Sequence, residues 1–172
     1  MPATAEDEVI LDTSVLINFL VVRRLDLLRN HPNFRFVVTD HVRAEITEHY
    51  ADQLAELESG LAAGWLRELP VNGPEELELF GELSAPGRLG AGECSAIAVA
   101  VCQKRALAID DKAARRRASA FNPKVKLLNT EALMVELIQA GRLSVAHADQ
   151  IKVAWEREHR FKLAFESFGD KL

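Results

Sequence analysis

The stretch EVILDTS, residues 8–14, combines two signals that together decide the fold of this chain. Its apolar run is short, as expected of a buried strand, and it ends in the acidic residue Asp12. Thr13 or Ser14 then caps a helix that the apolar spacing extends to about Arg29. The chain therefore begins its folded part with a strand that leads directly into a helix.

The same alternation continues outward from this stretch. Further strands are predicted at 34–38, 65–71, 106–109 and 124–128. Helices are predicted at 39–61, 75–83, 93–104, 112–120, 130–140 and 144–160. Strands that alternate with helices predict an α/β fold with a mostly parallel central sheet and helices on both faces.

Length and composition restrict the class of protein. The 172 residues suit one domain, and 48% hydrophobic with 27% charged residues excludes a disordered chain. No apolar run approaches the ~20 residues that span a bilayer, and residues 1–8 show no secretory signal, so we expect a cytoplasmic protein with no membrane partner. The net charge of −5 argues against broad binding of nucleic-acid backbones.

Acidic residues gather where the predicted strands end. Asp12 ends the first strand, and Asp110 and Asp111 end a later one, so all three belong to the same edge of a parallel sheet. Glu93 opens a helix after the glycine-rich stretch 89–92, and Glu45 lies one turn into the helix that follows the second strand. Four separate stretches thus bring carboxylates to one edge.

This convergence favours a divalent cation. Neighbouring carboxylates repel one another and raise each other's pKa unless a cation is present, and hard oxygen ligands suit Mg²⁺ or Mn²⁺. Such ions promote hydrolysis of phosphate esters. Each acid taken alone also fits a plainer role, as a helix cap or as part of a solvated helix face.

Four segments carry a resemblance to a known family: VILDTSVLIN (9–18), VTDHVRAEI (38–46), LGAGECSAIA (89–98) and AIDDKAAR (108–115). In this order, over residues 8–140, they resemble the PIN domain, and within it the VapC-like toxin ribonucleases of toxin–antitoxin pairs. The resemblance implies a three-layer α/β/α fold and cleavage of RNA that depends on Mg²⁺ or Mn²⁺. We expect a PIN-like nuclease domain at 1–143 and, packed on it, an extra C-terminal helical extension at 144–172.

The resemblance also assigns roles by position. It implies that the catalytic residues are Asp12, Glu45, Glu93 and Asp111, that the metal ligands come from Asp12, Glu93, Asp110 and Asp111, and that Ser14 supports the site. The register of the motif favours Asp111 over Asp110 as the ligand. The family often has a further acid two residues beyond, where this chain has Ala113 (or Lys112), which argues against a complete second metal site.

Two functions follow from these observations. The first is a metal-dependent endoribonuclease, the toxin of a toxin–antitoxin pair, with an RNA substrate, a small antitoxin partner and a homodimeric assembly. Lys112, Arg115 and Arg116 are candidates for RNA contacts beside the acids, although a solvated helix face explains them equally well. The alternative, motivated by Ala113 and the acidic net charge, is a PIN-like module that binds RNA or protein without cleaving it.

Overall fold

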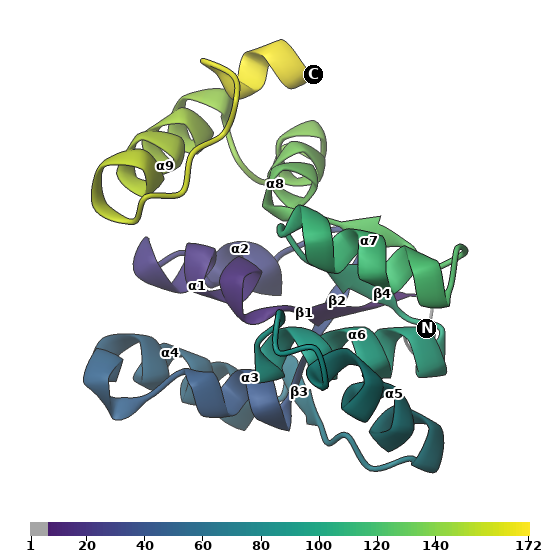
Figure 1. Ribbon diagram of the computed structural model, residues 1–172. Helices are drawn as coiled ribbons and strands as arrows, with labels where there is room; N and C mark the ends of the chain where they lie inside the picture. The colour runs from purple at the N-terminus through teal and green to yellow at the C-terminus, as the bar shows by residue number, and fades with distance from the viewer. Residues whose placement is uncertain (1–6) are drawn as a thin grey trace.

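Five parallel strands form the centre of the molecule, which we describe from a computed structural model for residues 7–172 (Figure 1). The strands lie in the order β3-β2-β1-β4-β5. Their bounds are β1 (Glu8–Leu11), β2 (Arg35–Thr39), β3 (Leu66–Leu69), β4 (Ala106–Ala108) and β5 (Leu127–Leu128). The predicted parallel sheet is confirmed. The prediction that no secretory signal is present concerns residues that lie largely outside the described ones.

The register of the sheet distributes its side chains between two hydrophobic clusters. Ile10 of β1 pairs with Val37 of β2 and Leu107 of β4, and all three belong to one cluster. Val9 and Leu11 point to the other face and belong to the second cluster. This alternation follows from the two-residue repeat of a strand, so apolar strand residues bury both faces of the sheet.

Helices cover each of these faces. One cluster includes residues of α1 (Thr13–Val21), α2 (Asp26–Arg29), α4 (Ala51–Ala62), α8 (Thr130–Gln139) and α9 (Val145–Glu158). The other includes residues of α5 (Pro74–Ser84), α6 (Ala91–Gln103) and α7 (Lys112–Phe121). The three-layer α/β/α fold implied by the resemblance is therefore confirmed.

The predicted helix from Thr13 or Ser14 to Arg29 is wrong as a single element. It ends at Val21, and Arg23 adopts a left-handed conformation with φ of 56°. The amide of Arg24 donates to the Phe19 carbonyl (2.9 Å) and that of Arg23 donates to Leu20 (3.0 Å), which is the hydrogen-bond pattern of a Schellman motif. Glycine usually occupies the left-handed position, so the sequence lacked the usual signal for this helix end.

The predicted helix from 39 to 61 is also interrupted. It consists of α3 (Asp40–Glu45), a 3₁₀ turn η2 (Glu48–Tyr50) and α4. Ile46 is extended, with φ of −89° and ψ of 99°, and its side chain is buried. Because the helix stops there, Glu45 becomes the last residue of α3.

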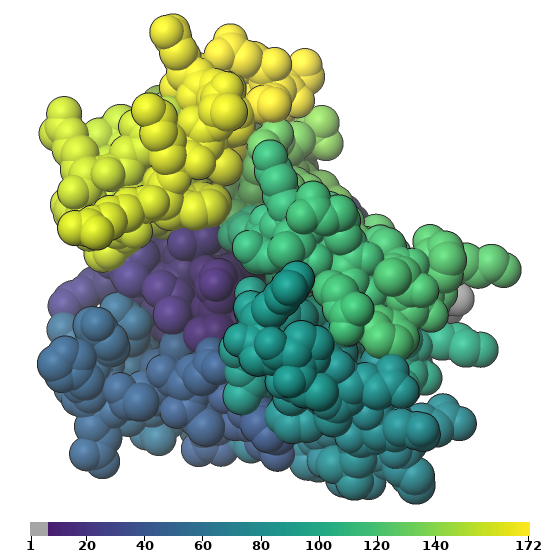
Figure 2. Space-filling view, viewed as in Figure 1, coloured from purple at the N-terminus to yellow at the C-terminus, as the bar shows by residue number. Residues whose placement is uncertain are grey.

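The C-terminal segment packs on the same core as the sheet. Trp155 of α9 is fully buried, and its Nε1 donates to the Asn18 carbonyl at 2.6 Å. Asp149 accepts hydrogen bonds from Ser167 Oγ (2.7 Å) and the Phe168 amide (2.8 Å), which fastens the final turn η3 (Phe168–Lys171) to α9. Figure 2 shows this yellow segment against the purple α1 region. Within residues 7–172, no helix is long and apolar enough to cross a membrane.

Candidate active site

Polar side chains close the junctions where strands pass into helices. Asp12 caps α1 after β1, Thr39 caps α3 at the end of β2, and Asp111 caps α7 after β4. Because the strands are parallel, these junctions lie at one edge of the sheet. The local need for helix caps therefore places carboxylates and hydroxyls at the edge where the sequence predicts the site.

Asp12 is the most unusual of these residues. Its side chain is fully buried, and Oδ2 accepts a hydrogen bond from the Ser14 amide at 3.3 Å. Oδ1 is buried and has no hydrogen-bond partner among the described residues. Burial, then the negative charge of Glu93, raises the pKa of Asp12 to about 7, with a smaller contribution from Glu45. This carboxylate therefore lies where a positive charge would relieve an electrostatic cost.

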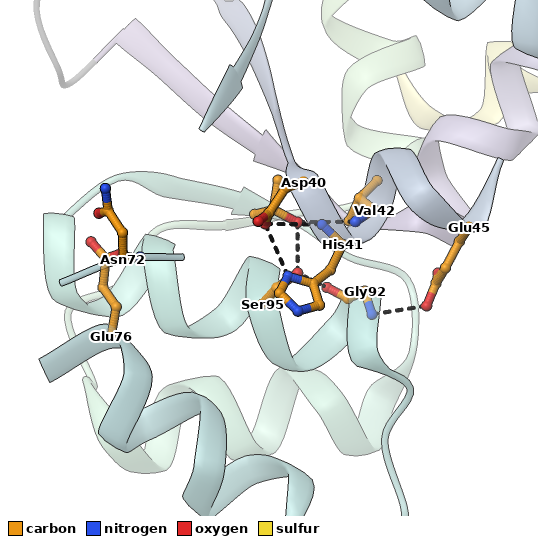
Figure 3. Close-up of polar contacts among 9 residues, drawn as sticks. Asp40, His41, Val42, Glu45, Asn72, Glu76, Gly92 and Ser95 are labelled. Carbon is orange, nitrogen blue, oxygen red and sulfur yellow. Dashed lines mark hydrogen bonds and ion pairs between the residues drawn. The ribbon is translucent and has the colours of Figure 1, made fainter. Parts of the chain in front are cut away.

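Glu45 connects the starts of two helices. Its Oε1 accepts from the Gly92 amide at 2.9 Å and its Oε2 accepts from Thr13 Oγ1 in a short hydrogen bond. Figure 3 shows Glu45 reaching from α3 to the beginning of α6. A Cβ on Gly92 would overlap Thr13 and lie 2.5 Å from Glu45 Oε2, so this close approach requires glycine.

Glu93 lies beside Glu45 at the start of α6. Its Oε2 accepts from the Gly90 amide at 2.9 Å, which forms part of a capping box. Glu45 Oε1 and Glu93 Oε2 lie 3.8 and 3.9 Å from the position that a Cβ on Gly90 would take. The two carboxylates thus flank the same point of the glycine-rich turn, and both contribute to the raised pKa of Asp12.

The two acids after β4 have different surroundings. Asp110 accepts from the Thr130 amide (2.9 Å), Thr130 Oγ1 (2.6 Å) and Asn18 Nδ2 (3.1 Å). Burial raises the pKa of Asp110, while the hydrogen bonds from Thr130 oppose that rise. Asp111 is exposed. Within the described residues, its side chain accepts one hydrogen bond, from the Ala114 amide at 2.7 Å. Asp111 is therefore the freer of the two to reach a ligand.

Asp111 and Glu93 share an open hollow of about 1010 Å³. Its other polar lining residues in the described chain are Arg88, Arg116 and Arg117. Carboxylates and guanidinium groups therefore face the same space, in which a cation and a phosphate group could each find an opposite charge.

The predicted RNA-contacting residues divide into two kinds. Arg115 is half-buried, and its Nη1 donates to the carbonyls of Ile109 (2.8 Å) and Leu128 (2.7 Å). It therefore joins the ends of β4 and β5 instead of facing a ligand. Lys112 and Arg116 are exposed and remain available for contact with a phosphate group.

Metal-ligand geometry is not preformed in the described part of the chain. No group of three or more His, Cys, Asp or Glu side chains there is arranged to hold a metal ion. Glu45 and Glu93 are instead bonded to the amides of Gly92 and Gly90. The unpaired oxygen of Asp12 and the carboxylate oxygens of these acids nevertheless suit a hard cation. To bind the ion with those oxygens, Glu45 and Glu93 would have to release their hydrogen bonds from the Gly92 and Gly90 amides.

Sequence reasoning missed several residues that shape this edge. Asn18 donates to both Asp110 and Thr130 Oγ1 (3.0 Å), and Thr13 donates to Glu45. A polar residue within an otherwise apolar helical stretch was the available signal for Asn18. The predicted support by Ser14 is a contact of its backbone amide with Asp12, and the role of its hydroxyl stays a prediction.

Comparison with known proteins identifies the family. A family model described as a PIN domain matches residues 8–157. A PilT N-terminus domain protein from the hyperthermophilic archaeon Sulfolobus solfataricus P2 has a similar structure, with a TM-score of 0.50 and 19% identity over 80% of this chain and 94% of that one. VapBC2 from Rickettsia felis, bound to a DNA fragment from its promoter, gives a TM-score of 0.49 and 17% identity over 71% of this chain and 98% of that one.

A search of curated proteins found no match. At 19% identity, the similarity to the PilT N-terminus domain protein concerns the fold alone. The family model, however, extends from β1 into α9 and includes every residue of the acidic edge. This chain belongs to the PIN domain family.

Proposed function

We propose that this chain is an endoribonuclease that hydrolyses RNA phosphodiesters with Mg²⁺ or Mn²⁺. The observation that carries the proposal is the state of Asp12, a fully buried carboxylate with one unpaired oxygen. Its pKa is raised to about 7, first by burial and then by Glu93. Membership of the PIN family, whose members are generally nucleases, supports the same reading.

Each residue of the edge has a part in this proposal. Asp12, Glu93 and Asp111 would hold the cation, while Glu45 would complete the ligand set or orient the attacking water. When bound, the cation polarises the phosphodiester and lowers the pKa of water. Asp110 fixes the end of β4 through Thr130 and is the second choice as a ligand.

The remaining cationic groups would act on the substrate. Arg116 and Arg117 line the hollow that Glu93 and Asp111 share, so they can neutralise a phosphate group next to the reacting one. Lys112 is exposed in the first turn of α7, immediately after Asp111. A side-chain nucleophile is not needed, because water supplies the attacking oxygen.

Purified protein and a fluorescent single-stranded RNA test the proposal. We expect cleavage with Mn²⁺, none with EDTA, and a loss of at least about 100-fold in Asp12→Asn, since metal catalysis supplies several kcal/mol of transition-state stabilisation. Asp26→Asn, which removes an exposed aspartate paired with Arg24, is the matched control and should cleave normally. Cleavage that survives EDTA or Asp12→Asn would contradict the proposal.

Two observations at the acidic edge favour a second candidate function. Ala113 stands where a further acid is common in the family, and Glu45 and Glu93 are engaged by backbone amides. A non-catalytic PIN-like module that binds RNA or protein would need no metal. RNA binding without cleavage at any Mn²⁺ concentration would support this alternative.

The biological setting is a further part of the proposal. The resemblance to VapC-like toxins supports a toxin that a small antitoxin restrains, in a homodimeric assembly. Co-expression with the product of a short neighbouring reading frame tests it. We expect a stable complex in size-exclusion chromatography and relief of growth inhibition. If expression of the chain alone does not inhibit growth, this result would argue for a housekeeping nuclease.

A further inference from the structure

A second, larger groove lies at the opposite edge of the sheet. Its lining includes Arg35, the first residue of β2, Ala106, the first residue of β4, and Lys126, which immediately precedes β5. The groove has a volume of about 1490 Å³. Parallel strands all begin at one edge and end at the other, so this groove lies across the sheet from Asp12 and Asp111.

The groove is rich in positive charge, and we call it the basic groove. Two acids, Asp7 and Glu136, are among its described lining residues, and its cationic residues are Arg29, Arg35, Lys104, Arg105, Lys124 and Lys126. Arg105 forms an ion pair with Glu8. The six cationic residues of the lining outnumber its two acids. The whole chain carries a net charge of −5, so this is a local concentration of positive charge.

Aromatic contacts fix part of the basic groove. Lys126 Nζ lies 4.5 Å from the centre of the Phe34 ring, and the His31 ring stacks on Phe34 at 5.0 Å. Asn33 Nδ2 donates to Glu136 at 3.0 Å, so the Glu136 carboxylate is already hydrogen-bonded within the protein. The ammonium group of Lys126 is therefore held beside the groove by a cation–π contact, not only by its flexible stem.

Helix α7 connects the two edges of the sheet. It begins after Asp111 at the acidic edge and is followed by Asn122 and Lys124, which line the basic groove. Ten helical residues span about 15 Å. Figure 1 shows α7 running from the centre of the molecule toward the right of the view. Arg117, which lines the hollow at the acidic edge, lies over the exposed Phe121 ring at 5.4 Å near the end of α7.

We propose that the basic groove binds the phosphate backbone of a single-stranded RNA substrate. The bound part of the strand lies beyond the phosphodiester that is cleaved at the acidic edge. The choice of RNA as the bound polyanion rests on the proposed function. Lysine and arginine contacts to phosphates are independent of base sequence and lower the affinity as salt rises. A single strand can bend around α7 over ~15 Å, whereas duplex DNA, with a persistence length of about 50 nm, cannot.

A binding assay in EDTA tests the groove separately from catalysis. The groove variant carries Arg29→Gln, Arg35→Gln and Lys124→Gln, all at exposed positions. Its affinity for a fluorescent oligouridylate of about twelve nucleotides, measured by anisotropy, should fall roughly tenfold or more. The slope of log affinity against log salt should become shallower by about 2, since each phosphate contact to a single strand contributes about 0.7.

A control variant removes the same amount of charge elsewhere. It carries Arg142→Gln, Arg157→Gln and Lys162→Gln, exposed residues that do not line the basic groove. We expect less than about a twofold change in affinity, because these side chains make no contact with the bound strand. Thermal unfolding of both variants verifies that they remain folded.

Three results would overturn the proposal: equal binding by the two variants, no binding by the wild type, or equally tight wild-type binding of duplex DNA or polyglutamate. The cleavage assay with Mn²⁺ separates this inference from the proposed function. If the wild type cleaves RNA but the two variants bind alike, the proposed function stands and the proposed role of the basic groove is refuted. If the wild type binds RNA through the basic groove but does not cleave it, the role of the groove stands and the proposed nuclease activity is refuted.

Discussion

Asp12→Asn should change how stability depends on pH, and the size of the effect follows from the burial of Asp12. The pKa of this carboxyl rises from 3.8 to about 7 on folding. The folded state then binds the proton more tightly than the unfolded state, so the free energy of unfolding falls as pH rises between these values. A shift of about 3 units at 1.36 kcal/mol per unit amounts to roughly 4 kcal/mol.

The assay is urea unfolding in EDTA from about pH 5 to pH 8, followed by the fluorescence of Trp65 and Trp155. About 2 units of the shift fall in this window, so the wild type should lose about 3 kcal/mol more than Asp12→Asn. Other titrating groups, such as Asp110 and His31, are common to both proteins and cancel in the difference.

Addition of Mg²⁺ extends the test. At pH 8 the ion should restore stability to the wild type, by about 2.7 kcal/mol at a concentration one hundred times its dissociation constant, and should leave Asp12→Asn unchanged. At pH 5 the wild-type carboxyl is protonated and the effect should be small. Parallel pH curves for the two proteins, or equal stabilisation by Mg²⁺, would refute the reasoning.

Substitutions at three further sites, with Gly81→Ala as a control, test other contacts by thermal or urea unfolding. Gly92→Ala should cost about 1–3 kcal/mol because its methyl group would overlap Glu45, whereas Gly81→Ala, with open space around it, should be neutral or slightly stabilising. Unchanged stability in Gly92→Ala would show that Glu45 can move away. Burial lowers the pKa of His31, so the wild type should lose stability as pH falls below about 6.5, and His31→Gln should lose less; equal losses would contradict this. Trp155→Phe removes a hydrogen bond to a backbone carbonyl of α1 and should cost about 1–3 kcal/mol, and a smaller cost would mean that water replaces the indole.

Much of the fold was predictable because the signals are local. Short apolar runs that end in Asp12 or in Asp110 and Asp111 are strands followed by capped helices. The ends of helices were less predictable. The break at Arg23 uses a left-handed arginine where glycine is usual, and the break at Ile46 follows from burial of an apolar side chain in the core.

The sequence indicated which acids lie at one edge of the sheet, but not how their side chains are bonded there, and their role as a site stays a prediction. The order of elements indicated that Asp12 and Glu93 belong to one edge, and the raised pKa of Asp12 agrees with their proximity. Neither spacing nor composition indicated that Glu45 accepts from the Gly92 amide, or that Asp110 is held by Thr130. These contacts join residues 20 to 47 positions apart, so they depend on packing.

The sequence alone determined which residues could form strands and helix caps, because periodicity and capping are properties of neighbours in the chain. It therefore determined that acids stand where parallel strands end. Only the tertiary structure decided which acid is buried with an unpaired oxygen, which arginine faces inward, and that the starts of the strands form a basic groove. Burial and electrostatic environment arise when distant segments pack together, and no local pattern contains them.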